Sequence, residues 1–206
     1  MAILGAFIMP HPPVILPEVG RVREREIAAT IRAFNACADR LRALNPETVV
    51  VVSPHATSYA DYFHISPGSK ASGNMARFGA PEATLRVKYD EALVQAISAA
   101  AARANVPAGT LGEREKDLDH GAFVPLYMVR SACPDAMIVR IGLSGLSPLE
   151  NYRLGQAILE AVSALNRRAA FIASGDLSHK LTSDGPYGFA PEGAVYDGYV
   201  NRAMST

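Results

Sequence analysis

Short apolar segments alternate along this chain with longer segments in which apolar residues recur at helical spacing. The short segments are rich in β-branched and small apolar residues, which predicts strands buried on both faces of a sheet: residues 3–8, 48–52, 136–142 and 169–173. The longer segments predict helices with an apolar face: residues 22–44, 89–104, 122–131 and 148–166. This alternation predicts an α/β fold in which helices flank a mostly parallel or mixed central sheet.

The segments between these elements are polar or rich in Gly and Pro. We predict a short strand at residues 62–66, a surface loop at residues 67–81 and a polar connection at residues 106–119. A further helix is predicted to begin near Ala194, and the chain stops soon afterwards at Thr206. We therefore expect one domain over residues 1–206 that lacks its C-terminal part.

Charge and composition exclude several classes of protein. Lys and Arg together number 20, as do Asp and Glu, so no basic surplus indicates binding to nucleic acid or to an anionic membrane. The apolar N-terminus lacks the basic region of a signal peptide, and no apolar run reaches the length of a membrane span. The two cysteines fit no metal or disulfide spacing and are interpreted as small buried residues. We expect a soluble, cytoplasmic protein.

Three of the five histidines follow predicted buried strands within a few residues: His11, His55 and His179. Because the carboxyl ends of parallel strands form the ligand-binding edge of such a sheet, these imidazoles are predicted to converge there. Prolines stiffen the backbone around His11 and before His55, as suits a metal ligand. The alternative for each is an ordinary loop histidine that is solvated or hydrogen-bonded.

The other two histidines lie in different settings. His64 follows an alternating pattern that places it beside core residues, so we interpret it as a structural histidine or one that supports the site. His120 lies between Asp119 and Gly121 at the start of a predicted helix, where it suits binding of an anionic or hydroxylated substrate. Asp119 is also a plain N-cap candidate, and both interpretations can hold together.

Motifs for several other chemistries are absent. Ser178 and His179 are adjacent, but no Gly-x-Ser-x-Gly elbow accompanies them, which argues against a serine hydrolase. The sequence contains no Walker loop, no dinucleotide-binding Gly-x-Gly-x-x-Gly and no His-Glu-x-x-His. The histidines therefore remain the main candidates for chemistry.

Five short segments, in order, resemble the class III extradiol ring-cleavage dioxygenases, the type of the protocatechuate 4,5-dioxygenase beta subunit. Closer still is the resemblance to members of the AmmeMemoRadiSam system and to the Memo proteins. The segments are Gly5-Ala6-Phe7-Ile8-Met9-Pro10-His11-Pro12-Pro13, Ser53-Pro54-His55, Asp61-Tyr62-Phe63-His64-Ile65-Ser66, Asp119-His120-Gly121 with Val124-Pro125-Leu126, and Ser174-Gly175-Asp176-Leu177-Ser178-His179.

The resemblance implies a role for each matched histidine. His11 and His55 correspond to two ligands of a non-haem Fe(II), although zinc or another divalent metal is an alternative. His179 corresponds to the catalytic acid–base group, and His120 to a catalytic histidine that contacts the substrate or oxygen. The family's third ligand, a glutamate or in Memo-like relatives a cysteine, is expected beyond Thr206.

The resemblance also implies partners: a small aromatic substrate, dioxygen and a second copy of the chain in a homodimer. The leading hypothesis is an iron-dependent extradiol dioxygenase that opens a catechol-like ring. The main alternative is a Memo-like protein that binds a metal or a partner without cleaving rings. A metal-dependent hydrolase is a weaker alternative, because it requires zinc and a carboxylate that activates water.

Overall fold

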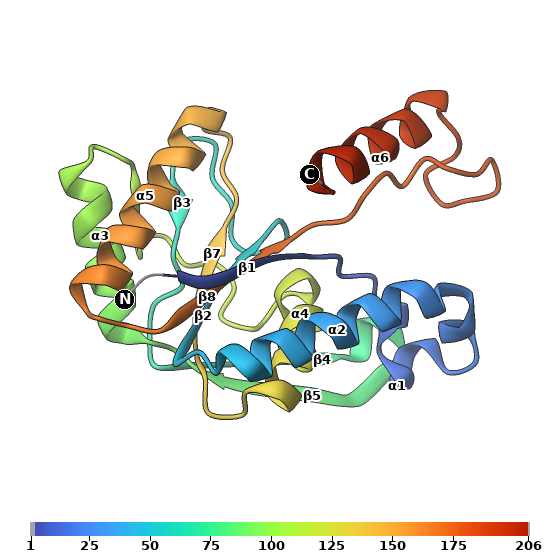
Figure 1. Ribbon diagram of the computed structural model, residues 1–206, viewed down its shortest axis with the longest axis horizontal. Coiled ribbons are helices and arrows are strands. Elements are labelled where there is room, and N and C mark those ends of the chain that lie inside the picture. Colours follow the sequence, from blue (N-terminus) through green and yellow to red (C-terminus); the bar gives the residue numbers. More distant parts are fainter. Residues whose placement is uncertain (1–2, 206) are drawn as a thin grey trace. The chain divides into compact units, whose positions relative to one another are not determined.

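A computed structural model describes residues 3–205, and it divides into two compact units, Met1–Ser174 and Gly175–Thr206. The first unit carries the central sheet and most of the helices, and the second carries a loop and one helix (Figure 1).

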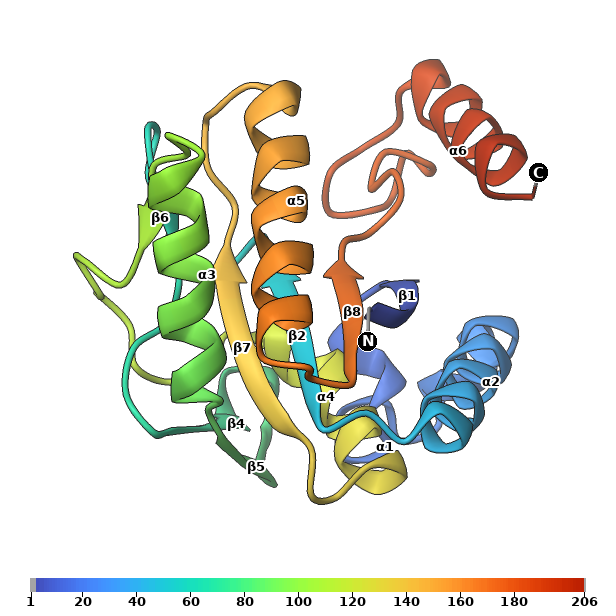
Figure 2. The same cartoon turned by 60° about the vertical axis from the view of Figure 1, so that its left-hand side comes forward.

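The first unit is built around a four-stranded parallel sheet with the strand order β1-β8-β2-β7 (Figure 2). Its strands are β1 (Ile3–Met9), β8 (Ala169–Ser174), β2 (Thr48–Ser53) and β7 (Met137–Gly142). Two smaller pairings lie outside it: β3 (Phe63–His64) with β6 (Ala108–Gly109), and β4 (Lys70–Met75) with β5 (Ala80–Lys88). The predicted α/β class with a parallel central sheet is confirmed.

Helices cover both faces of this sheet, which is why its strands are apolar throughout. Val49 and Val51 of β2 pack into a core with α2 and α4, whereas Val50 faces a second core with α3 and α5. The helices of the first unit are α1 (Pro17–Gly20), α2 (Ala28–Leu44), α3 (Glu91–Arg103), α4 (His120–Ala132) and α5 (Pro148–Ala164). Figure 2 shows α3 and α5 together on one side of the sheet.

Capping residues fix where these helices begin and end. Asp90 and Ser147 accept backbone N–H groups at the starts of α3 and α5, and Asn45 ends α2 in the left-handed conformation. The predicted helix over residues 22–44 is divided, because a 3₁₀ segment (Arg23–Ile27) precedes α2. Shorter 3₁₀ segments are Pro13–Ile15 and Ala76–Phe78.

The predicted surface loop at residues 67–81 is wrong, because the segment forms most of an antiparallel hairpin of β4 and β5. Gly and Ser in β4 suggest a loop, but Gly73 is needed for close packing: a Cβ there would lie 2.9 Å from the Cβ of Leu118. In β5, Ala83, Leu85 and Val87 are buried and alternate with exposed residues, as expected of a half-buried strand. The hairpin turns through Ala76–Phe78 and Gly79, whose φ is 78°.

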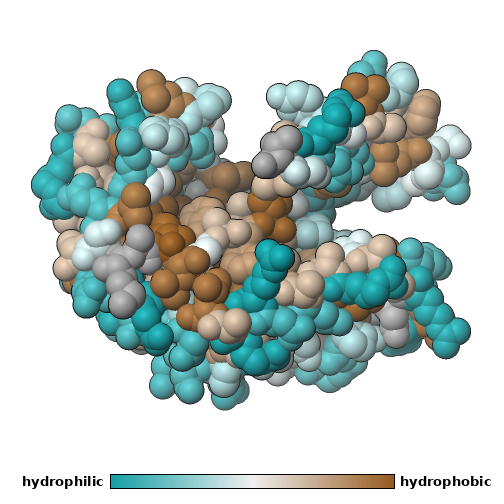
Figure 3. Space-filling model, in the orientation of Figure 1, coloured by the Kyte–Doolittle hydropathy of each residue, from teal (hydrophilic) through white to brown (hydrophobic). Residues whose placement is uncertain are grey.

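Strand β1 forms one edge of the sheet. Ile8 on this strand is 53% exposed, and Figure 3 shows apolar side chains over the region that β1 crosses in Figure 1.

Among the described residues, no helix combines the length and the apolarity needed to span a membrane.

The two cysteines are free thiols, as their spacing predicts. Cys133 is buried and Cys37 is half-buried, and burial raises the pKa of both thiols above the ordinary value.

Candidate metal centre

Three histidines come together at the carboxyl edge of the sheet. His11 follows β1, His55 follows β2, and His120 is the first residue of α4. One ring nitrogen from each lies within 4.8 Å of the others. Parallel strands on either side of β8 end at the same edge, which explains why His11 and His55 meet although they are 44 residues apart.

The two strand-end histidines face each other through the same type of atom. Nε2 of His11 lies 3.1 Å from Nε2 of His55, and the rings are perpendicular, with an interplanar angle of 89°. Two nitrogens that each lie about 2.1 Å from one ion, at a right angle, are about 3 Å apart. The spacing therefore fits two neighbouring ligands of a single divalent metal.

His120 completes the cluster from the helix side. Its ring centroid lies 4.0 Å from that of His55 and 5.5 Å from that of His11. Phe78 of the hairpin packs against the His120 ring at 5.3 Å. His11 is buried, His120 is half-buried and His55 is exposed, so the cluster opens to solvent on one side.

Ser174, the last residue of β8, holds the buried ring of His11. Its hydroxyl oxygen lies 2.9 Å from His11 Nδ1 and donates to the backbone carbonyl of Gly121 at 2.6 Å. All of these groups belong to the first unit, and the side chains of His11 and Ser174 are both buried. No pattern in the sequence indicates this contact, which joins residues 163 positions apart.

Asp119 connects the start of α4 to the backbone of His55. One carboxylate oxygen accepts the N–H of Ala122 at 2.9 Å, which confirms the predicted N-cap. The same oxygen accepts the Ser53 hydroxyl at 2.5 Å, and Ser53 in turn accepts the N–H of His55 at 3.2 Å. Gly121 is required in this crowded turn, because a Cβ there would lie 2.5 Å from Ser53 Oγ.

Arg140, in the middle of β7, is a second residue that supports the cluster from a distance in sequence. Its side chain is only 1% exposed, and its nearest carboxylate oxygen is that of Asp119, at 3.7 Å. Its guanidinium donates to Ser66 Oγ at 2.7 Å and to the backbone carbonyls of Asp117 at 2.6 Å and Glu115 at 2.9 Å. It therefore fixes the connection that delivers Asp119 and His120. The only sequence signal is a charged residue within an apolar strand.

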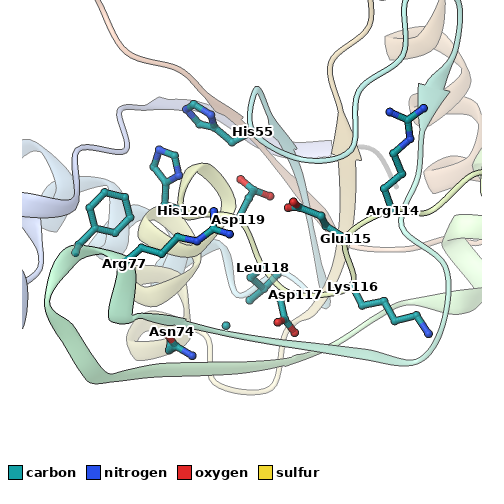
Figure 4. A pocket seen from close by; sticks show the side chains of 12 residues that line it. His55, Asn74, Arg77, Arg114, Glu115, Lys116, Asp117, Leu118, Asp119 and His120 are labelled. Carbon is teal, nitrogen blue, oxygen red and sulfur yellow. The ribbon is translucent and has the colours of Figure 1, made fainter.

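A cavity of about 680 Å³ adjoins the cluster. It is lined by His55 and His120, by the hairpin turn and by the connection that precedes α4. In Figure 4, the side chain of Arg77 extends from the hairpin toward His120 and Asp119, whereas Lys116 points away from both histidines. Among the residues whose side chains the structure describes, none forms a hydrogen bond or an ion pair with Arg77.

His64 lies outside the cluster, as its sequence pattern predicts. It is 1% exposed, and its Nδ1 donates to the backbone carbonyl of Leu111 at 3.0 Å. Burial, as the largest cause, lowers the pKa of His64 below the ordinary value. The contact gives it a structural role in holding the connection after β6.

His179 belongs to the second unit, which contains α6 (Pro191–Met204). Its Nε2 lies 3.2 Å from a carboxylate oxygen of Asp176, and its ring stacks on Tyr187 at 4.9 Å. The backbone N–H of Ser178 donates to Asp197 of α6 at 2.8 Å. An imidazole oriented by a carboxylate can exchange protons, and the role of His179 at the metal site stays a prediction.

The fold and the cluster define an α/β protein with a three-histidine candidate metal centre at the carboxyl edge of its parallel sheet. The chain belongs to the family described as the catalytic LigB subunit of aromatic ring-opening dioxygenase, whose sequence model matches residues 5–204. The predicted membership of the class III extradiol dioxygenase superfamily is confirmed.

Several curated proteins are similar in sequence. Protein CA_C1420 of Clostridium acetobutylicum is 38% identical over 204 residues, which cover 96% of this chain and 44% of that protein. A 2,3-dihydroxyphenylpropionate/2,3-dihydroxicinnamic acid 1,2-dioxygenase of Burkholderia vietnamiensis is 28% identical over 75% of this chain and 50% of its own length. The protein of the same name from Escherichia coli is 27% identical over 69% of this chain and 46% of its own length. This chain thus spans about half the length of these relatives.

Proposed function

We propose that this protein is a non-haem Fe(II)-dependent extradiol dioxygenase that opens a catechol-like aromatic ring. The observation that carries the proposal is the pair of Nε2 atoms of His11 and His55, 3.1 Å apart, in a chain that belongs to a family of ring-opening dioxygenases. His120 and the adjoining cavity supply a proton carrier and room for a small aromatic substrate.

In this proposal, His11 and His55 hold the metal as neutral imidazoles. Imidazole nitrogen is a good ligand for both iron and zinc. The two histidines therefore fit Fe(II), and they would fit zinc equally well. When bound, a ferrous ion supplies open positions for the catechol oxygens and for dioxygen. The remaining chemistry is assigned to side chains of this protein.

His120 and His179 are proposed as the catalytic residues. A histidine titrates near neutral pH, so it can take a proton from a catechol hydroxyl and later return it. Phe78 packs against the His120 ring, with the two ring centroids 5.3 Å apart. Asp176 orients the imidazole of His179 through their 3.2 Å contact.

The proposed substrate is a catechol that carries an acidic side chain. Arg77 extends into the cavity as a cation with no ion-pair partner among the described side chains, so a carboxylate of the substrate can pair with it. Two of the similar proteins are named for dihydroxylated phenylpropionic and cinnamic acids, which combine a catechol with a carboxylate.

The test is oxygen uptake by the purified protein after anaerobic loading with ferrous iron. We expect uptake and a coloured ring-opened product with at least one catechol of a panel that includes acidic catechols. His11→Ala and His55→Ala are expected to abolish both the activity and the bound iron. The control is His64→Asn, a buried histidine outside the cluster, which should retain iron.

His179→Ala tests the acid–base assignment separately. We expect the rate of ring opening to fall by a factor of about 10²–10⁴ while the iron content stays unchanged. Tight metal binding with no oxygen uptake on any catechol would reject the dioxygenase and favour a metal-binding protein that lacks ring-opening activity.

A further inference from the structure

The hydroxyl of Ser174 determines which nitrogen of His11 carries the proton. A carbonyl oxygen can only accept, so Ser174 must use its single proton in the 2.6 Å hydrogen bond to Gly121. The Ser174 oxygen can then only accept from His11 Nδ1, 2.9 Å away. His11 therefore carries its proton on Nδ1 and presents the lone pair of Nε2 toward His55.

The carbonyl of Gly121 is available to Ser174 because of a proline in α4. In a helix, this carbonyl would accept the N–H of the residue four positions later, which is Pro125. Proline has no N–H, so the internal hydrogen bond cannot form. The Ser174 hydroxyl supplies the missing donor from the neighbouring strand.

Burial and close packing hold this arrangement in place. His11 is 4% exposed and Ser174 is 8% exposed, so water has little access to either group. The turn at Gly121 is closely packed, because a Cβ added there would lie 3.1 Å from a ring carbon of His55. If His11 lost the proton on Nδ1, Ser174 and the imidazole would each present only lone pairs to the other.

We propose that Ser174 and Pro125 are positioning residues that fix the tautomer of His11 and so prepare its Nε2 to bind metal. Pro125 leaves a carbonyl without a helical donor, Ser174 binds that carbonyl, and His11 donates to Ser174. The assignment of a metal rests on the proposed function. The tautomer itself is a property of the metal-free protein and can be measured without any activity.

The first experiment is long-range ¹H–¹⁵N NMR of the metal-free protein labelled at histidine. We expect the wild-type His11 signals to show a protonated Nδ1 and an unprotonated Nε2. Ser174→Ala should give a mixture of tautomers or the reverse one, and Ser174→Thr, which retains a hydroxyl, should restore the wild-type pattern. A wild-type spectrum with the proton on Nε2 would overturn the proposal.

The second experiment is the dissociation constant for zinc, used as a probe that does not require turnover. Ser174→Ala should weaken binding about 10- to 100-fold, as is typical when the partner of a ligating histidine is removed. Ser98→Ala is the matched control, because Ser98 also donates to a backbone carbonyl, that of Val94 at 2.8 Å, in helix α3. Equal affinities for wild type and Ser174→Ala would refute the role of Ser174.

Pro125→Ala isolates the contribution of the proline. The new N–H competes with Ser174 for the Gly121 carbonyl, so we expect weaker zinc binding than wild type but stronger binding than Ser174→Ala. The double variant should bind no more weakly than Ser174→Ala alone, because both changes act through one hydroxyl. Pro148→Ala at the first position of α5 is the control. Additive losses, or no loss with Pro125→Ala, would remove the proline from the proposal.

Discussion

Buried polar side chains, rather than the apolar core, set the geometry of the histidine cluster at the scale of single residues. Arg140 satisfies two backbone carbonyls of the connection before α4 and lies beside Asp119, which in turn binds Ser53. A charge this deeply buried is retained only if its partners remain in place. The position of His120 therefore depends on a residue in a different element.

Arg140→Met should destabilise the protein by about 3–5 kcal/mol, because it leaves Asp119 buried without its cation. Arg140→Lys should cost less, since it retains the charge but loses the forked donor geometry. Urea unfolding measures both. The surface variant Arg103→Met is the control, because Arg103 pairs with Glu160 in solvent. A loss below about 1 kcal/mol for Arg140→Met would show that the network contributes little to stability.

His64 gives the protein a pH-dependent stability on the acidic side of neutrality. Burial lowers its folded-state pKa below the unfolded value, so the unfolded chain binds a proton first as the pH falls. This contribution to stability is complete above about pH 6.5 and is lost as the pH falls toward the folded-state pKa.

We expect His64→Asn to flatten the dependence of the unfolding free energy on pH below about pH 6.5. The asparagine amide can still donate to the Leu111 carbonyl, so the hydrogen bond is conserved while the titration is removed. Chemical denaturation at a series of pH values makes the comparison. An unchanged slope would show that another group causes the acid sensitivity.

At the scale of elements, the β4–β5 hairpin forms part of the pocket wall and supplies Arg77 and Phe78. Periodicity predicted the four core strands and most helices closely, because each buries a continuous apolar face. The hairpin was not predicted, because Gly73 and its polar neighbours suggest a loop until the packing of Leu118 is known. The hairpin side of the pocket was therefore the least predictable part of the candidate site.

Arg77→Gln should raise the KM for a catechol with a carboxylate side chain by about 10- to 100-fold, which corresponds to losing a charge-assisted hydrogen bond. The KM for unsubstituted catechol should change little, because that substrate has no anionic group to pair. Steady-state oxygen uptake with both substrates measures the ratio. Lys116→Gln, which removes a cation that points away from the histidines, is the matched control. Equal changes for both substrates would exclude Arg77 as the carboxylate partner.

At the scale of the whole molecule, the parallel sheet brings segments that are distant in sequence next to one another. The residues of the site that lie at strand ends could therefore be predicted. His11 and His55 follow strands of one parallel sheet, so the rule about carboxyl ends was enough to bring them together. Ser174 acts through a contact with Gly121 of α4, which is 53 positions away in the sequence. Arg140 acts through contacts with the connection before α4, 23 and 25 positions away. A pattern of apolar residues contains no information about such pairings.

Because the proposed metal ligands His11 and His55 follow separate strands, metal binding should stabilise the folded protein as a whole. Zinc at about 100 times its dissociation constant should add about 2.7 kcal/mol to the unfolding free energy, and Tm should rise with metal concentration. His55→Ala should abolish this rise, whereas His64→Asn should retain it. Differential scanning calorimetry gives the comparison, and equal rises in His55→Ala and wild type would place the bound metal elsewhere.

Strand β8 lies between β1 and β2, and this order has a consequence during synthesis on the ribosome. Strand β1 has its sheet partner in residues 169–174, which leave the exit tunnel only after the whole intervening segment has been made. At about 5–20 residues per second, the apolar segment Ile3–Met9 waits on the order of 10–30 s for that partner. The histidine cluster therefore forms only after β8 has been synthesised, and until then the unpaired β1 segment is open to chaperones.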